Sequence, residues 1–229
     1  MSEQPRQAAD DRGHGANDGR SRPAVPEPLR GLYAVTPDEP DTARLLMLAE
    51  RVLAGRPVLL QYRNKIAGAA LRREQACALQ RLCRAAGVPF IVNDDLALAL
   101  EIDADGAHLG RDDGAPAAAR KALGVRRILG LTCYADWSRA TEGAAVGADY
   151  IAFGAMFPST TKPNAPPAPF AMIARARREL GLPVAAIGGI TLANAGEVLA
   201  AGADLLAVVS DVFAADDPAA RAAAYRALF

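Results

Sequence analysis

The sequence predicts an α/β fold, a (β/α)8 TIM barrel in a single domain with a disordered N-terminal tail. Eight short apolar runs alternate with segments rich in Ala, Leu and Arg, which is the pattern of repeated β/α units. The apolar runs are nearly continuous, as in parallel strands covered by helices on both faces. The stretch LYAVTPDEP, which contains the first run and the residues after it, lacks the glycine-rich fingerprint of a doubly wound open sheet. The pattern therefore favours the barrel over the open sheet, its alternative.

Each expected element follows from a local pattern. Strands are expected where apolar runs are bounded by turn or charged residues, and helices where Ala, Leu and Arg recur between them. Helices are expected at 42–54, 72–87 and 191–202, among others. The last two end at Gly87 and Gly202, because glycine adopts the left-handed conformation that ends many helices. The strands are expected at 32–36, 57–63, 89–94, 106–110, 127–133, 150–157, 183–189 and 205–210.

Residues 1–28 differ from the rest of the chain in composition. They are polar, rich in Gly, Pro, Asp and Arg, and contain almost no large apolar side chain. Such a segment buries too little surface to offset the entropy lost on ordering. We expect a disordered tail at 1–28, followed by a barrel catalytic domain at 29–229.

Charge and cysteine content restrict the classes of partner. The chain has 26 basic and 26 acidic residues, so no global charge excess favours nucleic acid. No apolar run reaches the length of a membrane span. The three cysteines lack CxxC spacing, which suits a reducing compartment. We expect a cytoplasmic protein that binds small molecules rather than nucleic acid or membrane, and the sequence leaves open whether it is a homo-oligomer.

Polar side chains gather at the ends of the expected strands, where the active site of such a barrel lies. Gln61, Arg63 and Lys65 alternate, so in an extended strand they share one face. Carboxylates from neighbouring strand ends suit Mg²⁺, and cations beside them suit a diphosphate. An ion pair between Arg63 and Asp94 with a purely structural role is the alternative. The other residues collected here are Asn93, Asp94, Asp95, Asp112, Asp113, Thr132, Ser159, Thr160, Thr161 and Lys162.

A second anion site is expected at the last two strands. In AAIGGITLANA two glycines lead into an expected helix, and Ser210 ends the next strand. Backbone N–H groups and a helix dipole at this position attract phosphate. The alternative is that the glycines serve only a tight turn.

The sequence contains six motifs in this order: QYRNK, PFIVNDD, HLGRDD, FPSTTK, AAIGGIT and VVSDV. Together they resemble the thiamine-phosphate synthase family, and the resemblance extends from about Leu32 to Phe229. The resemblance implies a transferase that condenses 4-amino-2-methyl-5-hydroxymethylpyrimidine diphosphate with 4-methyl-5-(2-phosphoethyl)thiazole or its carboxylated form. The products would be thiamine phosphate and pyrophosphate. It also implies one Mg²⁺ ion, held by Asp94 and Asp113.

The resemblance also implies roles for individual residues. Arg63, Lys65 and Lys162 would be the catalytic cations at the diphosphate. The pyrimidine diphosphate would be bound by Gln61, Tyr62, Arg63, Asn64, Lys65, Asn93, Thr132 and Lys162. The thiazole phosphate would be bound by Ser159, Thr160, Thr161, Gly189, Val209 and Ser210.

The roles of some residues and two alternative functions stay open at this point. Thr132 stands where the family commonly has serine, and the pattern favours Asp113 over Asp112 as a metal ligand. His108 is expected to be structural. The alternatives to a synthase are a thiazole tautomerase of the same superfamily and a non-catalytic paralogue that senses thiazole phosphate.

Overall fold

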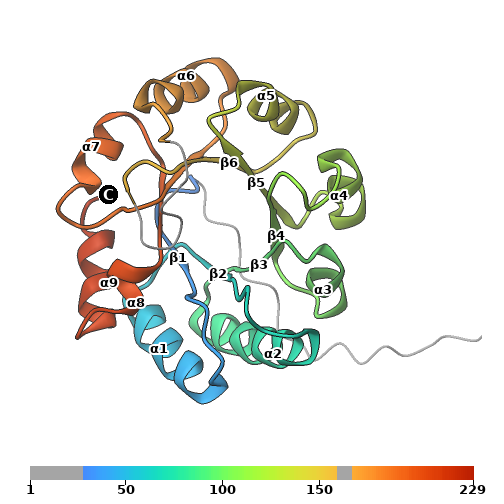
Figure 1. Cartoon of the computed structure of the whole chain (residues 1–229), viewed down its shortest axis with the longest axis vertical. Coiled ribbons are helices and arrows are strands. Elements are labelled where there is room, and N and C mark those ends of the chain that lie inside the picture. The colour runs from blue at the N-terminus through green and yellow to red at the C-terminus, as the bar shows by residue number, and fades with distance from the viewer. Residues whose placement is uncertain (1–27, 159–166) are drawn as a thin grey trace, which may run out of the picture.

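The strands close into a barrel. The structure is a computed structural model that describes residues 28–158 and 167–229. Within these ranges eight parallel strands pair in chain order, and the last pairs with the first (Figure 1). This closure confirms the predicted barrel and excludes the open sheet, whose two edge strands do not pair. The predicted tail lies outside the described residues, apart from Pro28.

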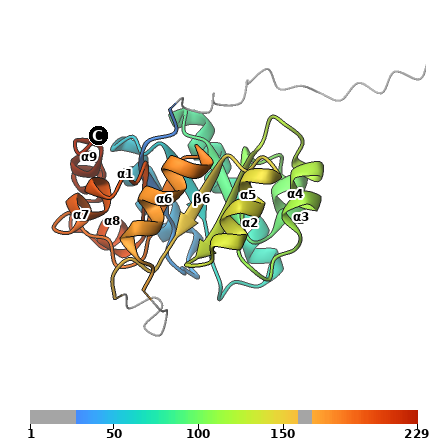
Figure 2. The same cartoon turned by 90° about the horizontal axis from the view of Figure 1, so that it is seen from above.

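Helices surround the barrel and alternate with its strands, as Figures 1 and 2 show. The strands are β1 (Gly31–Val35), β2 (Leu59–Tyr62), β3 (Phe90–Asn93), β4 (Gly106–Leu109), β5 (Ile128–Tyr134), β6 (Tyr150–Phe153), β7 (Val184–Ile187) and β8 (Leu205–Val208). The helices are α1 (Thr42–Ala54), α2 (Ala69–Ala86), α3 (Leu96–Glu101), α4 (Pro116–Leu123), α5 (Trp137–Ala145), α6 (Phe170–Leu180), α7 (Ala195–Ala200), α8 (Ser210–Phe213) and α9 (Pro218–Arg226). No helix in the described ranges combines the length and the apolar character needed to cross a membrane.

All eight expected strands are present, but some bounds differ. Helix α1 coincides with the expected 42–54, whereas β6 ends at Phe153, before the expected 157. Helix α7 begins at Ala195 rather than at 191. The side chain of Asn194 accepts a hydrogen bond from the Thr191 N–H at 2.8 Å, which forms a turn before the helix.

Strand alternation separates two apolar layers. In β1 and β2, Tyr33 and Leu59 point into the barrel, where they pack with Ile91 and Tyr150. The intervening residues, such as Leu60, point outward against the helices. Because side chains along a strand alternate between its two faces, the side chain of Gln61 also points inward, toward the barrel axis.

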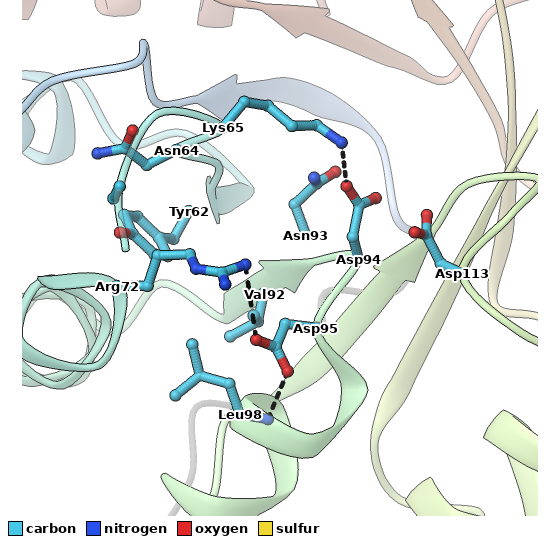
Figure 3. Close-up of a pocket in the computed structure, with 11 residues that line it drawn as sticks. Tyr62, Asn64, Lys65, Arg72, Val92, Asn93, Asp94, Asp95, Leu98 and Asp113 are labelled. Carbon is cyan, nitrogen blue, oxygen red and sulfur yellow. Dashed lines mark hydrogen bonds and ion pairs between the residues drawn. The ribbon is translucent and has the colours of Figure 1, made fainter. Parts of the chain in front are cut away.

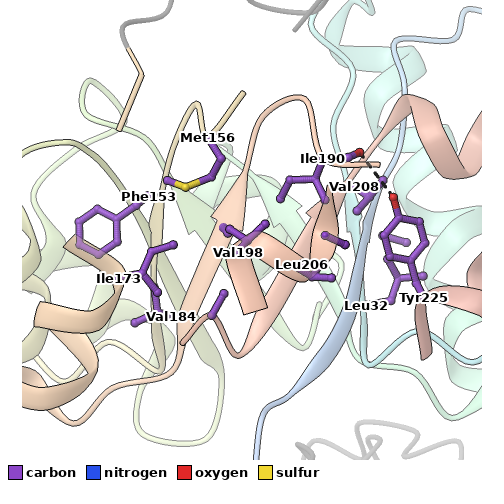
Figure 4. Packing of buried hydrophobic residues seen from close by; sticks show 14 of the residues in the cluster. Leu32, Phe153, Met156, Ile173, Val184, Ile190, Val198, Leu206, Val208 and Tyr225 are labelled. Carbon is purple, nitrogen blue, oxygen red and sulfur yellow. Dashed lines mark hydrogen bonds between the residues drawn. The ribbon is translucent and has the colours of Figure 1, made fainter. Parts of the chain in front are cut away.

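The outer layer anchors the strands that carry the second predicted anion site. Figure 4 shows this packing at β6, β7, β8 and β1. Leu206 and Val198 are fully buried there, and burial of each such side chain stabilises the fold by about 1.5–3 kcal/mol. The strand ends at the site therefore project from a rigid support.

Candidate active site

A cavity of about 470 Å³, the central cavity, lies at the carboxyl ends of the strands. Tyr33 and His108, at inward-facing positions of β1 and β4, line it beside residues from the strand ends. The predicted site residues on its wall are Gln61, Arg63, Asn93, Thr132, Gly189, Val209 and Ser210. Residues from both predicted anion sites therefore meet in one cavity.

A second cavity of about 270 Å³, the side cavity, lies beside β2 and β3 (Figure 3). Asn93 lines both cavities, so the two adjoin at the end of β3. Arg72 of α2 lines the side cavity and was not predicted from the sequence. The predicted residues on its wall are Tyr62, Asn64, Lys65, Asn93, Asp94 and Asp113.

The structure changes the expected arrangement of Gln61, Arg63 and Lys65. Strand β2 ends at Tyr62, and the N–H of Arg63 donates to the hydroxyl of Thr36 at 2.8 Å. Beyond the strand end the alternation of faces no longer applies. Gln61 and Arg63 line the central cavity, whereas Lys65 lines the side cavity. The prediction that all three share one face was therefore wrong for Lys65.

Two carboxylates and a cation lie together in the wall of the side cavity. Lys65 donates to Asp94, and Asp113 lies beside Asp94 (Figure 3). Asp113 is turned inward because its Oδ2 accepts the N–H of Gly110 at 2.8 Å, whereas Asp112 is exposed. The structure thus places Asp113, not Asp112, next to Asp94.

The paired carboxylates influence each other's protonation. Burial opposes ionisation of Asp94, but hydrogen bonds from Lys65 and Asp113 outweigh it and lower the pKa of Asp94. Burial and the neighbouring Asp94 raise the pKa of Asp113. Two carboxylates that compete for one proton form an oxygen-donor pair that a hard divalent cation would satisfy. The chemistry of Asp94 and Asp113 therefore fits the expected Mg²⁺.

Arg63 has a partner other than the one considered in the sequence. Its Nη1 donates to Asp38 Oδ1 at 3.0 Å, and the same oxygen accepts the backbone N–H of Lys65 at 2.7 Å. The structural ion pair between Arg63 and Asp94 is thus not formed. Asp38 was missed because it lies in a loop after β1, where an isolated carboxylate gives no sequence signal.

The contacts of Asp38 predict different outcomes for two substitutions. Asp38→Ala removes the oxygen that anchors the segment 63–65 and is expected to weaken binding of inorganic pyrophosphate about tenfold. Asp38→Asn keeps an acceptor oxygen for the Lys65 N–H, and we expect a Kd within about threefold of wild type. Isothermal titration calorimetry with pyrophosphate and Mg²⁺ measures both. Equal losses in the two variants would contradict the anchoring role.

The polar groups of Tyr62 and Asn64 bind other parts of the protein. The Tyr62 hydroxyl donates to Gln75 at 2.9 Å, and Asn64 Nδ2 donates to the Glu39 carbonyl at 2.7 Å. These bonds fasten the end of β2 to α2 and to the loop after β1. Direct contacts of Tyr62 and Asn64 with a ligand stay a prediction.

A continuous chain of hydrogen bonds crosses the barrel interior beneath the central cavity. Gln61 Nε2 donates to the Tyr33 hydroxyl at 2.5 Å, and the hydroxyls of Tyr33 and Tyr150 are 2.6 Å apart. His108 Nδ1 is 2.9 Å from the Tyr150 hydroxyl, and His108 Nε2 is 2.6 Å from Thr132 Oγ1. His108 therefore joins two side chains, and one of them is the predicted ligand-binding residue Thr132.

The second predicted anion site is built around Gly188 and Gly189. Both have positive φ, +101° and +63°, and a Cβ on Gly189 would lie 2.4 Å from the Pro158 carbonyl oxygen. The loop after β7 therefore packs closely against the start of the loop after β6, which only glycine allows. Ser210, at the start of α8, lines the same cavity. The remaining predicted residues, Ser159, Thr160, Thr161 and Lys162, lie outside the described residues.

The family model, the curated relatives and one solved structure point to the same family. A family model described as thiamine monophosphate synthase matches residues 32–212. The chain is 66% identical over 201 residues to a thiamine-phosphate synthase of Aromatoleum aromaticum, covering 88% of this chain and 97% of the relative. It is 61% identical over 203 residues to one of Azoarcus sp., covering 89% and 98%. A solved structure of a thiamine phosphate pyrophosphorylase from Pyrococcus furiosus matches with a TM-score of 0.76 at 30% identity, covering 86% and 94%.

Proposed function

The chain belongs to the thiamine monophosphate synthase family and is a transferase, and from this premise we propose which substrates it joins. The first is 4-amino-2-methyl-5-hydroxymethylpyrimidine diphosphate. The second is 4-methyl-5-(2-phosphoethyl)thiazole or its carboxylated form. The products are thiamine phosphate and pyrophosphate, and the carboxylated thiazole additionally releases its carboxylate as CO₂. The proposed setting is the cytoplasm, where free thiols such as those of this chain persist.

The observation that carries the proposal is the meeting of two kinds of anion site at one barrel mouth. Beyond the end of β2, Arg63 pairs with Asp38 in the wall of the central cavity, and Lys65 pairs with Asp94, next to Asp113, in the adjoining side cavity. Across the central cavity lie the glycine loop after β7 and Ser210. A diphosphate near the cations and a phosphate near the loop would bring the reacting ring atoms of two substrates together, which lowers the entropic cost of their encounter.

We assign the diphosphate to the charged side of the mouth. Arg63 and Lys65 would hold its oxygens, with Lys162 as a further cation predicted from the family pattern. Asp94 and Asp113 would hold one Mg²⁺ ion. When bound, that ion would neutralise charge on the diphosphate as it leaves.

The reaction we propose is a dissociative displacement. The bond between the pyrimidine methylene carbon and the diphosphate oxygen breaks, and its electron pair leaves with the diphosphate. The aminopyrimidine ring delocalises the positive charge on the methylene until the lone pair of the thiazole nitrogen forms the new C–N bond. No protein nucleophile is needed, because Arg63 and Lys65 act by electrostatic stabilisation of the leaving group.

One assay distinguishes this function from its two alternatives. The purified chain is mixed with both substrates and Mg²⁺, and thiamine phosphate and pyrophosphate are quantified. We expect equimolar formation of both products. Isomerisation of the thiazole without coupling would identify a tautomerase, and binding of thiazole phosphate without any product would identify a sensor.

Ser210→Ala tests the phosphate side of the cavity. Loss of one hydroxyl donor to a phosphate is expected to raise the KM of the thiazole substrate about tenfold, with a smaller effect on the KM of the diphosphate substrate. Steady-state kinetics with each substrate varied in turn give both constants. A change confined to the diphosphate substrate would mean that the two anion sites are exchanged.

A further inference from the structure

The hydrogen-bond chain from Gln61 through Tyr33, Tyr150 and His108 to Thr132 links five strands of the barrel. Tyr33 and Tyr150 are fully buried, with their rings edge to face at a centroid distance of 5.5 Å. The rings of His108 and Tyr150 stack at 5.6 Å. Packing therefore holds the groups of the chain in place, and each of its hydrogen bonds constrains the next.

The donor at one end, Gln61 Nε2, indicates a direction of donation along this hydrogen-bond chain. Burial raises the pKa of both Tyr33 and Tyr150 above the ordinary value, so each hydroxyl keeps one proton to donate. Tyr33 accepts from Gln61, so all hydrogen bonds are satisfied when Tyr33 donates its own proton to Tyr150 and Tyr150 donates to His108 Nδ1. With its proton on Nε2, the imidazole would complete this direction and donate to Thr132. In this direction the hydroxyl proton of Thr132 is available to the cavity.

The same direction determines which edge Gln61 presents to a ligand. One of the two Nε2 hydrogens is used by Tyr33, so the other is available. Within the described residues Gln61 Oε1 forms no hydrogen bond, yet it is not sealed from solvent. Since Gln61 lines the central cavity, the amide offers an acceptor and a donor side by side.

We propose that the hydrogen-bond chain behind Gln61 holds its amide in the orientation that selects a 4-aminopyrimidine over a 4-oxopyrimidine. This rests on the proposed function. A 4-aminopyrimidine presents an N–H donor beside the ring N3 acceptor, which matches Oε1 and the available N–H of Gln61. A 4-oxopyrimidine presents a carbonyl acceptor beside N3–H, which would require the amide to be reversed. Tyr33, Tyr150 and His108 are thus positioning residues for substrate selection.

Tyr33→Phe removes the hydroxyl that fixes the amide. The measurement is the ratio of kcat/KM for the pyrimidine diphosphate to kcat/KM for its 4-oxo analogue, with the thiazole substrate saturating. We expect this ratio to fall about tenfold or more, because the freed amide can offer either edge. If turnover of the analogue is below detection, its inhibition constant against the amino substrate replaces kcat/KM.

A double-mutant cycle tests whether Tyr33 acts through Gln61. Gln61→Met removes the amide and should reduce the ratio at least as much as Tyr33→Phe. In the Gln61→Met background, Tyr33→Phe should then change the ratio by less than about twofold. The matched control is Tyr225→Phe, which removes another buried tyrosine hydroxyl, one that donates to Asp211 at 2.7 Å. It should leave the ratio unchanged.

The outcomes separate this inference from the proposed function. Wild-type protein that forms no thiamine phosphate from the amino substrate would overturn the proposed function. If the wild-type protein is active and Tyr33→Phe loses kcat/KM equally toward both pyrimidines, only the selection role is overturned. The reason is that a merely structural defect leaves the ratio of the two kcat/KM values unchanged. Additive effects of the two substitutions would show that Tyr33 does not act through Gln61.

Discussion

Replacing Asp94 by asparagine is expected to lower kcat by about 100-fold or more, which corresponds to about 2.7 kcal/mol of lost transition-state stabilisation. Asp94 is the carboxylate that Lys65 contacts and that raises the pKa of Asp113. An amide carries no charge, so the variant loses one of the two anionic ligands for the proposed Mg²⁺. The Kd of the thiazole phosphate should change by less than about threefold, because Asp94 does not line the central cavity.

Asparagine is the right replacement because of the backbone at this position. Asp94 has φ of +63°, a left-handed conformation that Asp and Asn adopt more readily than other non-glycine residues. Alanine would add backbone strain to the loss of charge, so the change in kcat could not be attributed to the charge alone. The control is Asp112→Asn, at an exposed carboxylate two residues beyond Gly110, which should keep kcat near wild type. Equal losses of kcat and of thiazole affinity in Asp94→Asn would count against the assignment.

Gly189→Ala is expected to raise the KM of the thiazole substrate about tenfold or more and to destabilise the fold by about 1–3 kcal/mol. The φ of Gly189 is +63°, and a Cβ there would lie 2.4 Å from the Pro158 carbonyl oxygen and 2.9 Å from Phe157 Cβ. Because a backbone atom cannot yield as a side chain does, the loop after β7 must move. Thermal unfolding and steady-state kinetics measure the two effects.

Gly196→Ala is the matched control for that substitution. Gly196 lies in α7, and a Cβ there would meet no atom within 4 Å. Alanine is the better helix former by about 0.5–1 kcal/mol, so this variant should be slightly more stable, with an unchanged KM. A Gly189→Ala protein with wild-type kinetics would show that the phosphate does not depend on the loop.

The barrel and its family could be predicted from local patterns. In the segment 42–54 the local sequence shows where a helix begins and how its apolar residues recur, and α1 has these bounds. The apolar runs give all eight strands, since a strand buried on both faces is apolar throughout. The family predicted from the six motifs is confirmed by the family model and by the relatives named thiamine-phosphate synthase.

Contacts between distant segments could not be predicted in this way. Tyr33 and Tyr150 are 117 residues apart and lie in apolar runs, so their sequence context suggests only core packing. Asp38 acquires its role because β1 and β2 are neighbours, which brings it to Arg63 and Lys65. Lys65 leaves the face of Gln61 because β2 ends at Tyr62, and the next N–H, that of Arg63, donates to the Thr36 hydroxyl of a neighbouring segment.

By itself, the order of apolar and polar residues determined that this chain forms eight β/α units and that charged groups follow their strands. Periodicity is a local property, because it reflects which faces of a helix or strand are buried. Only the closed barrel decided which charges pair and which carboxylate adjoins Asp94. It also decided that Gln61 is hydrogen-bonded to one of two buried tyrosines that contact each other. Hydrogen bonds and ion pairs act over a few ångströms, so these partnerships exist only once the strands lie side by side.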